Sequence, residues 1–339
     1  MSPSKQSRSR VRAAKPKRAA VETLHFDDNA RLRALIGEGD RNLILIESEL
    51  GVRLSAPGSG QIQVEADDAH ARADARRVIN RLYSRLGDGL MCDDSDVRSA
   101  ILLSEAEEGD DASTLIRVPR GASFQARTPR QGDYVRALKN DRDTDLIFGV
   151  GPAGTGKTLL AVAYGASQLV MRRVERLIIT RPAVEAGEKL GFLPGDLAEK
   201  VDPYLLPVWD ALSDALGKTQ MEKMREELRI EVAPLAFMRG RTLNRAFIVV
   251  DEAQNATRAQ MRMVLTRLGQ GSRMAVTGDP TQTDLDRRQP SGLPEALDIL
   301  KNDARVAITR FDRSDVVRHD LVARIVEAYE SADAKSKTE

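Results

Sequence analysis

Residues 151–158 read GPAGTGKT and match the phosphate-binding pattern G-x-x-x-x-G-K-[ST] at every position. An apolar strand pattern at 146–150 precedes the loop and helical spacing follows it, which is the context that this pattern requires. The glycines let backbone N–H groups curl around phosphates, and the helix N-terminus adds partial positive charge. We expect Lys157 to bridge the β- and γ-phosphates and the Thr158 hydroxyl to bind Mg²⁺. The predicted nucleotide loop comprises Gly151, Pro152, Ala153, Gly154, Thr155, Gly156, Lys157 and Thr158.

Two adjacent carboxylates follow a second buried strand pattern, in residues 247–254, which read FIVVDEAQ. Four successive apolar residues are typical of a strand buried on both faces of a parallel sheet. Asp251, at the end of that strand, is predicted to hold Mg²⁺ through water. Glu252 points elsewhere, toward the γ-phosphate, where it is predicted to activate the attacking water. The loop and the two acids together predict hydrolysis of a nucleoside triphosphate, with Lys157 and Glu252 as catalytic residues.

Polar side chains also follow a third strand pattern, in residues 274–282, which read MAVTGDPTQ. The carboxyl ends of parallel strands meet at one edge of a sheet, so we expect Asp279 and Gln282 near the γ-phosphate, with Gln282 as a catalytic sensor. Upstream, the amide of Gln131 matches N7 and the amino group of adenine; the alternative is a plain helix start at Pro129. Because the chain lacks the guanine-reading sequence Asn-Lys-x-Asp, the predicted cofactors are ATP and Mg²⁺.

Arginines near these motifs leave two interpretations open. Arg181 follows a strand pattern and either reaches nucleic acid or a phosphate, or forms a salt bridge. Arg239 and Arg241 flank Gly240 in a short basic turn that either touches RNA phosphates or is simply solvated. A Gly-containing segment after Arg181 is predicted to be a loop over the site, with charged residues Glu185, Glu188 and Lys189.

Five strand patterns alternate with helical stretches, at 146–150, 177–180, 247–250, 274–277 and 306–309. This alternation is typical of α/β proteins with a parallel sheet covered on both faces. The predicted fold class is therefore α/β, a RecA-like P-loop NTPase with a doubly wound parallel sheet over residues 114–330. A small α+β KH-like domain is predicted to precede it.

That N-terminal domain, residues 21–86, has the expected order β-α-α-β-β-α. Its segment LIGEGDRNLILIESELGVRL resembles the KH core, in which a Gly-x-x-Gly loop joins two helices and clamps an RNA backbone. Gly37 matches the first glycine, whereas Asp40 stands at the second, where a carboxylate would repel phosphate. The loop therefore either grips RNA or belongs to a scaffold that docks proteins or oligomerises. A disordered basic tail at 1–20, an acidic linker with one short helix at 87–113 and a disordered tail at 331–339 complete the predicted organisation.

Composition narrows the class of protein. The chain has 339 residues, 41% hydrophobic and 30% charged, with a formal charge of +1. Its single cysteine, Cys92, excludes an internal disulfide and a cysteine-based zinc cluster. No apolar run approaches the length of a membrane helix, and the first 20 residues lack the apolar centre of a secretory signal. We expect a cytoplasmic protein without a membrane partner.

Residues 114–330 closely resemble the PhoH family of bacterial ATPases. The resemblance rests on RPAVEAGEKLGFLPGDL from Arg181, DPYLLPVWDAL from Asp202, FMRGRTLNRAFIVVDEAQNAT from Phe237, TGDPTQTDL from Thr277 and SDVVRHDLV from Ser314. It implies ATP hydrolysis, a role in RNA metabolism, an association with phosphate limitation and a partnership with an rRNA-processing endoribonuclease. The PIN domain of the nuclease-fused branch has no room in this sequence.

Only 57 residues follow Gln282, too few for a second motor domain. The transition state of γ-phosphate transfer benefits from an added cation, so we expect a cyclic homo-oligomer, a hexamer, in which each subunit gives an arginine to its neighbour's site. Arg318 is the first candidate because it lies in the family-matching SDVVRH, and Arg310 and Arg313 are the others. The leading function is an RNA-associated motor or remodeller, with helicase activity open. The second is a nucleotide-switched adaptor that recruits a nuclease, and a small-molecule kinase is the weaker third.

Overall fold

The computed structural model describes residues 20–105, 111–182, 197–286 and 288–316. The chain divides into two compact units, residues 1–105 and 106–339. Each unit has its own hydrophobic core. None of the helices in the described ranges is both long and apolar enough to cross a membrane.

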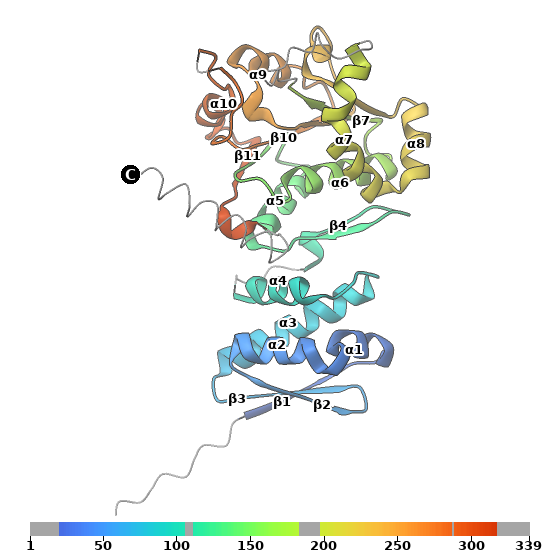
Figure 1. Ribbon diagram of the computed structural model, residues 1–339, viewed down its shortest axis with the longest axis vertical. Coiled ribbons are helices and arrows are strands. Elements are labelled where there is room, and N and C mark those ends of the chain that lie inside the picture. The colour runs from blue at the N-terminus through green and yellow to red at the C-terminus, as the bar shows by residue number, and fades with distance from the viewer. Residues whose placement is uncertain (1–19, 106–110, 183–196, 287, 317–339) are drawn as a thin grey trace, which may run out of the picture. The chain divides into compact units, whose positions relative to one another are not determined.

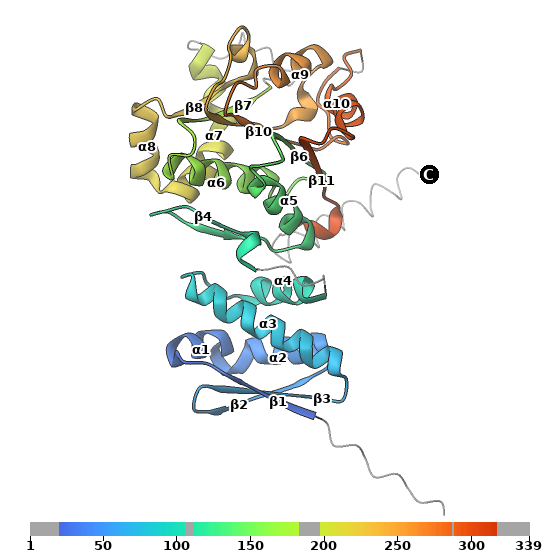
Figure 2. The same ribbon diagram turned by 180° about the vertical axis from the view of Figure 1, so that it is seen from behind.

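In the N-terminal unit, three helices lie on one face of a three-stranded antiparallel sheet (Figures 1 and 2). The strands β1 (Ala20–His25), β2 (Arg53–Gly58) and β3 (Gln61–Ala66) are arranged in the order β1-β3-β2. The helices are α1 (Asn29–Ile36), α2 (Arg41–Leu50) and α3 (Ala69–Gly87). Their order along the chain is the order that the sequence predicts.

The loop between α1 and α2 is where the KH resemblance expects two glycines. It forms a short 3₁₀ turn, η1 (Glu38–Asp40), after Gly37. Asp40 has a φ of 61°, in the left-handed region that glycine adopts most readily. The backbone at this position therefore suits the glycine of the KH pattern, but the chain carries a carboxylate there.

The acidic stretch 87–113, for which the sequence predicts a linker with one short helix, contains such a helix in the structure. Residues of this stretch form α4 (Asp94–Glu105), which packs against α2 and α3. Val97, Ala100 and Ile101 of α4 are buried in the N-terminal core. Acidic side chains in the first turn of α4 favour helix formation because they oppose the helix dipole. Residues 94–105 of the predicted linker therefore form a helix of the first unit, and the division between units falls after residue 105.

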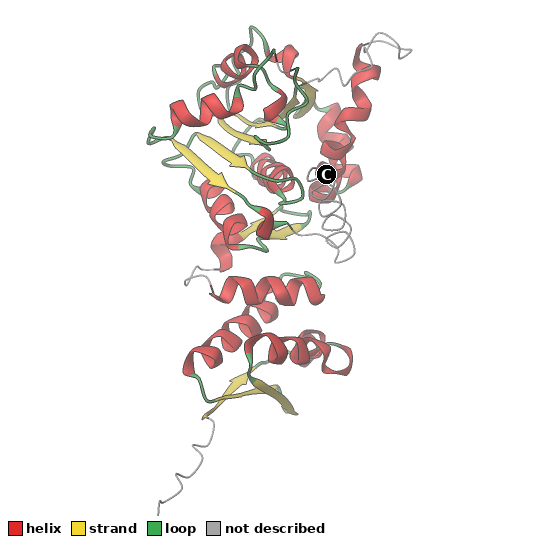
Figure 3. Ribbon diagram, turned by 60° about the vertical axis from the view of Figure 1, so that its left-hand side comes forward, coloured by secondary structure: helices red, strands yellow, loops and turns green. Residues whose placement is uncertain are grey.

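The C-terminal unit is an α/β domain built on a six-stranded parallel sheet with helices on both faces (Figure 3). The strand order is β11-β6-β10-β9-β7-β8. One face packs on α5 (Pro129–Lys139), α6 (Lys157–Val170), α7 (Leu197–Leu216) and α8 (Lys218–Glu226). The other packs on α9 (Arg258–Leu265) and α10 (Leu293–Leu300). This is the predicted doubly wound, RecA-like fold.

All five predicted strands are present, as β6 (Leu146–Val150), β7 (Arg176–Arg181), β9 (Ala246–Val250), β10 (Arg273–Gly278) and β11 (Val306–Arg310). The edge strand β8 (Ile230–Pro234) and the hairpin of β4 (Leu115–Arg117) and β5 (Ser123–Gln125) were not predicted. In register, Gly278 of β10 lies beside Val150 of β6, and Val276 beside Val250 of β9. The loops that follow these three central strands therefore emerge at the same edge of the sheet.

Candidate nucleotide-binding site

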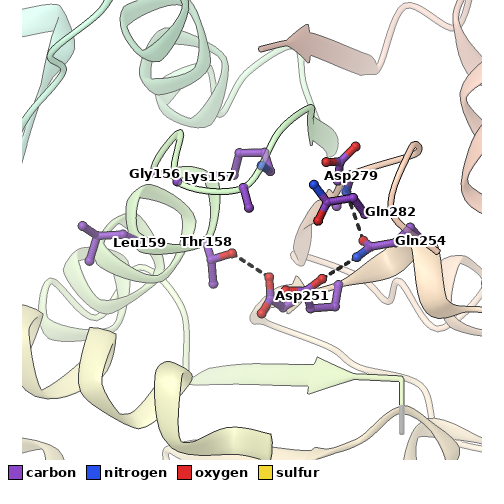
Figure 4. A pocket seen from close by; sticks show the side chains of 12 residues that line it. Gly156, Lys157, Thr158, Leu159, Asp251, Gln254, Asp279 and Gln282 are labelled. Atoms are coloured by element: carbon purple, nitrogen blue, oxygen red, sulfur yellow. Dashed lines mark hydrogen bonds between the residues drawn. The ribbon is translucent and has the colours of Figure 1, made fainter. Parts of the chain in front are cut away.

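A cavity of about 290 Å³ lies at that edge (Figure 4). Three chain segments line it: the loop and first turn of α6, the residues after β9, and the residues after β10. The lining residues are Ala153, Gly154, Gly156, Lys157, Thr158, Leu159, Asp251, Glu252, Gln254, Gly278, Asp279 and Gln282. The structure thus brings together residues from the three sequence motifs, at 151–158, 247–254 and 274–282.

The loop before α6 has a conformation that requires glycine. Gly151 has a φ of 142°, and a Cβ there would lie 2.3 Å from the carbonyl oxygen of Phe311. Gly156 has a φ of 78° and precedes α6 without any side-chain cap. The backbone N–H groups of the first turn of α6 are therefore not capped by a side chain, which is the arrangement that binds an anion.

Lys157 is 7% exposed, and its ammonium group lies inside the loop. Nζ donates hydrogen bonds to the carbonyl oxygens of Gly151, at 2.7 Å, and Pro152, at 2.5 Å. Burial lowers the pKa of Lys157 below its usual range, and the nearby carboxylates of Asp279 and Glu252 oppose that shift. Phosphate oxygens would supply the negative charge that a buried ammonium favours, so the lysine fits its predicted role.

Thr158 and Asp251 form the contact that a Mg²⁺ site requires. The Thr158 hydroxyl donates to Asp251 Oδ1 at 2.6 Å, and the Thr277 hydroxyl donates to the same oxygen at 2.8 Å. Asp251 is 5% exposed and leads out of buried β9. Hard oxygen donors such as a hydroxyl and a carboxylate fit Mg²⁺, which keeps several waters. Thr277, which orients the carboxylate, was missed by the sequence analysis, although it stands in the TGDP motif.

Glu252 turns away from Asp251 because its backbone is left-handed, with a φ of 51°. One carboxylate oxygen, Oε1, lies 3.3 Å from Nη2 of Arg181, the last residue of β7. The other, Oε2, accepts a hydrogen bond from the side-chain amide of Gln254. Of the two interpretations of Arg181, the salt bridge is the one observed.

Gln254 connects Glu252 with the turn after β10 (Figure 4). Its Oε1 accepts the backbone N–H of Asp279 at 3.0 Å. Asp279 Oδ1 accepts the backbone N–H and the hydroxyl of Thr281, whereas Oδ2 is buried and has no hydrogen-bond partner among the described residues. Gln282 lines the same cavity. The two strand-end motifs are thus joined by one buried amide.

Gln131 differs from its predicted role. Its side chain is 4% exposed, and its Oε1 accepts the backbone N–H of Arg127 at 2.7 Å. Its Nε2 donates to the carbonyl oxygen of Thr155 at 3.0 Å. Both ends of the amide hold protein groups that would otherwise be unpaired, so in this structure Gln131 braces the nucleotide loop instead of presenting its amide to a base.

The remaining candidates that the structure describes do not line the cavity. In the basic turn, Arg241 forms an ion pair with Glu231. Its guanidinium is therefore neither free to bind an RNA phosphate nor simply solvated. Arg310 and Arg313 are described and lie outside the cavity lining. Other candidates fall outside the described residues, namely Glu185, Glu188, Lys189 and Arg318.

The parallel sheet, the loop before α6 and the paired acids after β9 define a P-loop ATPase. Residues 123–330 match the family model described as PhoH-like protein, and the chain therefore belongs to the PhoH family. It is 45% identical to a PhoH-like protein of Bacillus subtilis over 88% of this chain and 93% of that one. A PhoH-like protein of Synechocystis is 46% identical, with 89% and 92% covered, and protein PhoH of Escherichia coli is 42% identical, with 76% and 71% covered.

Among solved structures, the Sulfolobus solfataricus SWI2/SNF2 ATPase core in complex with dsDNA is similar to this chain at a TM-score of 0.33 and 17% identity. The match covers 49% of this chain and 34% of that one.

Proposed function

We propose that this PhoH family ATPase acts in RNA metabolism as an RNA-associated motor, in a homo-oligomeric ring of six chains. One observation carries the ring. Among the described residues that line the cavity, Lys157 is the single cation, and it faces three carboxylates, those of Asp251, Glu252 and Asp279. A second cation for the transition state would then come from a neighbouring chain.

Each polar residue of the cavity is proposed to have its own role in hydrolysis. Thr158 and Asp251 would hold Mg²⁺, which neutralises charge on the β- and γ-phosphates when bound. Lys157 would exchange its loop carbonyls for phosphate oxygens as the nucleotide enters. Glu252 would accept the proton of the attacking water. Gln282 would contact the γ-phosphate, and Gln254 would transmit its loss to Glu252.

The donated cation is proposed to be Arg318, with Arg310 and Arg313 as the other candidates. Arginines supplied to such a site raise hydrolysis by about 10³–10⁵ in other phosphoryl-transfer enzymes. The donor and the acceptor site are tested separately by mixing two inactive variants, Arg318→Ala and Lys157→Ala. Mixed rings would contain intact site pairs and recover activity, whereas full activity of Arg318→Ala alone would refute the assignment.

The motor itself is tested by measuring phosphate release with and without RNA, on material whose oligomeric state is determined in the same buffer by light scattering. We expect a ring and RNA-stimulated hydrolysis, with strand separation as the further measurement for helicase activity. A monomer that hydrolyses ATP at the same rate with and without RNA would contradict the proposal.

The second candidate function is a nucleotide-switched adaptor that recruits an endoribonuclease to RNA or the ribosome. The contact that favours it is the engagement of both Glu252 oxygens, by Arg181 and Gln254, which is suited to slow hydrolysis and a long-lived ATP state. Slow, RNA-insensitive turnover combined with ATP-dependent binding of the nuclease would favour this function over the motor.

A further inference from the structure

The segment after β8 presents an aromatic ring and a cation to solvent. Phe237 lies in the short 3₁₀ turn η4 (Leu235–Met238) and is 50% exposed. Arg239, two residues later, is exposed too, and it forms no ion pair with any residue that the structure describes. An exposed aromatic ring beside an unneutralised guanidinium is suited to a nucleic-acid strand.

The cation stands at the tip of a β-turn. The backbone N–H of Arg241 donates to the carbonyl oxygen of Met238 at 3.3 Å. Arg239 has φ −62° and ψ 132°, and Gly240 has a φ of 77°, which are the dihedral angles of a type II turn. A Cβ on Gly240 would meet nothing within 4 Å, so the tip is open to a ligand.

Contacts with the rest of the domain hold the backbone of the turn in place. Leu235 and Met238 are buried at 1% and 0% exposure. Arg241 binds Glu231 through two hydrogen bonds, of 2.5 and 2.8 Å, and Arg267 donates to the carbonyl oxygen of Arg241 at 2.9 Å. The backbone around Phe237 is therefore held by packing and ion pairing, which lowers the entropy lost when a ligand binds there.

The segment that carries the turn begins at the same edge of the sheet as the nucleotide cavity. Pro234, the last residue of β8, lies opposite Arg181 in the β7–β8 register. Arg181 in turn pairs with Glu252. Arg241, which follows the tip of the turn, reaches back to Glu231 near the start of β8, so the turn itself lies along the edge strand.

We infer that Phe237 and Arg239 form a contact site for single-stranded RNA, in which a base stacks on the Phe237 ring and Arg239 binds a phosphate. Stacking requires a base that is free of its partner strand, which selects single strands over duplexes. Glu231 pairs with Arg241 and Glu175 pairs with Arg245, whereas no carboxylate among the described residues pairs with Arg239. The segment 235–245 itself contains no Asp or Glu. Phosphate, rather than a protein carboxylate of this segment, is thus the counter-charge. The inference rests on the proposed RNA-associated function.

The test measures binding of a fluorescein-labelled 20-nucleotide poly-uridine RNA to the full-length chain by fluorescence anisotropy, over a range of salt concentrations. We expect Phe237→Ala and Phe237→Leu to weaken binding about 5- to 100-fold, and Phe237→Trp to retain it, because only the last keeps an aromatic face. Arg239→Ala should weaken binding and reduce the salt slope by about 0.7, the loss of one single-strand phosphate contact. Arg245→Ala is the control, since Arg245 is an exposed arginine of the same segment whose charge is already paired with Glu175.

Basal phosphate release and light scattering on the same variants separate the outcomes. If wild-type protein does not bind the RNA, both the proposed function and this site are refuted. If it binds, and Phe237→Ala and Arg239→Ala bind equally well, this site alone is refuted. If Phe237→Ala dissociates the ring while Phe237→Leu preserves both the ring and RNA binding, the turn is a contact between copies of the chain, which also overturns the inference.

Discussion

Arg181 and Glu252 form an ion pair, with 3.3 Å between Nη2 and Oε1, across the ends of neighbouring strands β7 and β9. Gln254 donates to the other carboxylate oxygen of Glu252. A general base needs a free oxygen toward the proton that it takes. The two contacts fix the orientation of the Glu252 carboxylate, so turning it toward a water would need one of them to yield, and the ion pair with Arg181 is the partly solvated one of the two.

The change Arg181→Ala is expected to raise basal ATP hydrolysis, up to about fivefold, because it frees Glu252 Oε1. Partly exposed ion pairs contribute about 1 kcal/mol or less, which sets this limit. Phosphate release without RNA gives the rate, and Arg181→Lys, which keeps the charge, is the control. A loss of activity of tenfold or more in Arg181→Ala would mean that the arginine serves the phosphates instead of restraining Glu252.

The residues of the cavity were predictable because strand ends in a parallel sheet meet at one edge. FIVV and MAVT each predict a buried strand, so Asp251 and Asp279 had to emerge near the loop that carries Lys157. That rule needs only the period of the apolar residues and the position of the polar residue that ends each run.

Side-chain hydrogen bonds and ion pairs between segments far apart in the sequence could not be predicted from strand ends in this way. Nothing local to Gln131 indicates that the backbone of Arg127 and Thr155 takes up both ends of its amide. Nothing local to Arg241 indicates that Glu231 neutralises it. The sequence predicts one short helix in the acidic stretch, but nothing local to Val97, Ala100 and Ile101 of α4 indicates that they are buried in the N-terminal core.

Two substitutions separate nucleotide binding from chemistry. Lys157→Ala should weaken binding of a fluorescent ATP analogue as well as hydrolysis, because the ammonium contacts the phosphates in both ground and transition states. Glu252→Gln should bind the analogue normally and hydrolyse ATP about 10²- to 10⁴-fold more slowly, since only proton transfer is lost. Equal loss of binding in both variants would show that Glu252 is needed for the shape of the site.

The Arg241–Glu231 pair predicts a pH-dependent contribution to stability. Hydrogen bonding to Arg241 holds the pKa of Glu231 below its usual range, which is about 4.3. Because the folded-state pKa is the lower one, the stabilisation is present in full above about pH 5 and is lost as the pH falls through the folded-state value. Urea unfolding at pH 7 should show that Arg241→Ala costs about 1 kcal/mol, with the difference from wild type vanishing in acid. A difference that persists in acid would assign it instead to the contact between Arg241 Nη1 and the sulfur of Met238, which lie 3.8 Å apart.

Gly278 is the position where the smallest change should disturb the link between the two strand-end motifs. A Cβ there would lie 2.7 Å from Gln254 Oε1 and 2.9 Å from Leu293 Cδ2, so Gly278→Ala must displace the amide that joins Asp279 to Glu252. We expect overpacking to cost about 1–3 kcal/mol of unfolding free energy and kcat to fall while KM changes little. Gln254→Ala, which removes the amide without the clash, should lower kcat similarly but leave more of the stability. Normal kcat in both variants would show that Glu252 and Asp279 work without this connection.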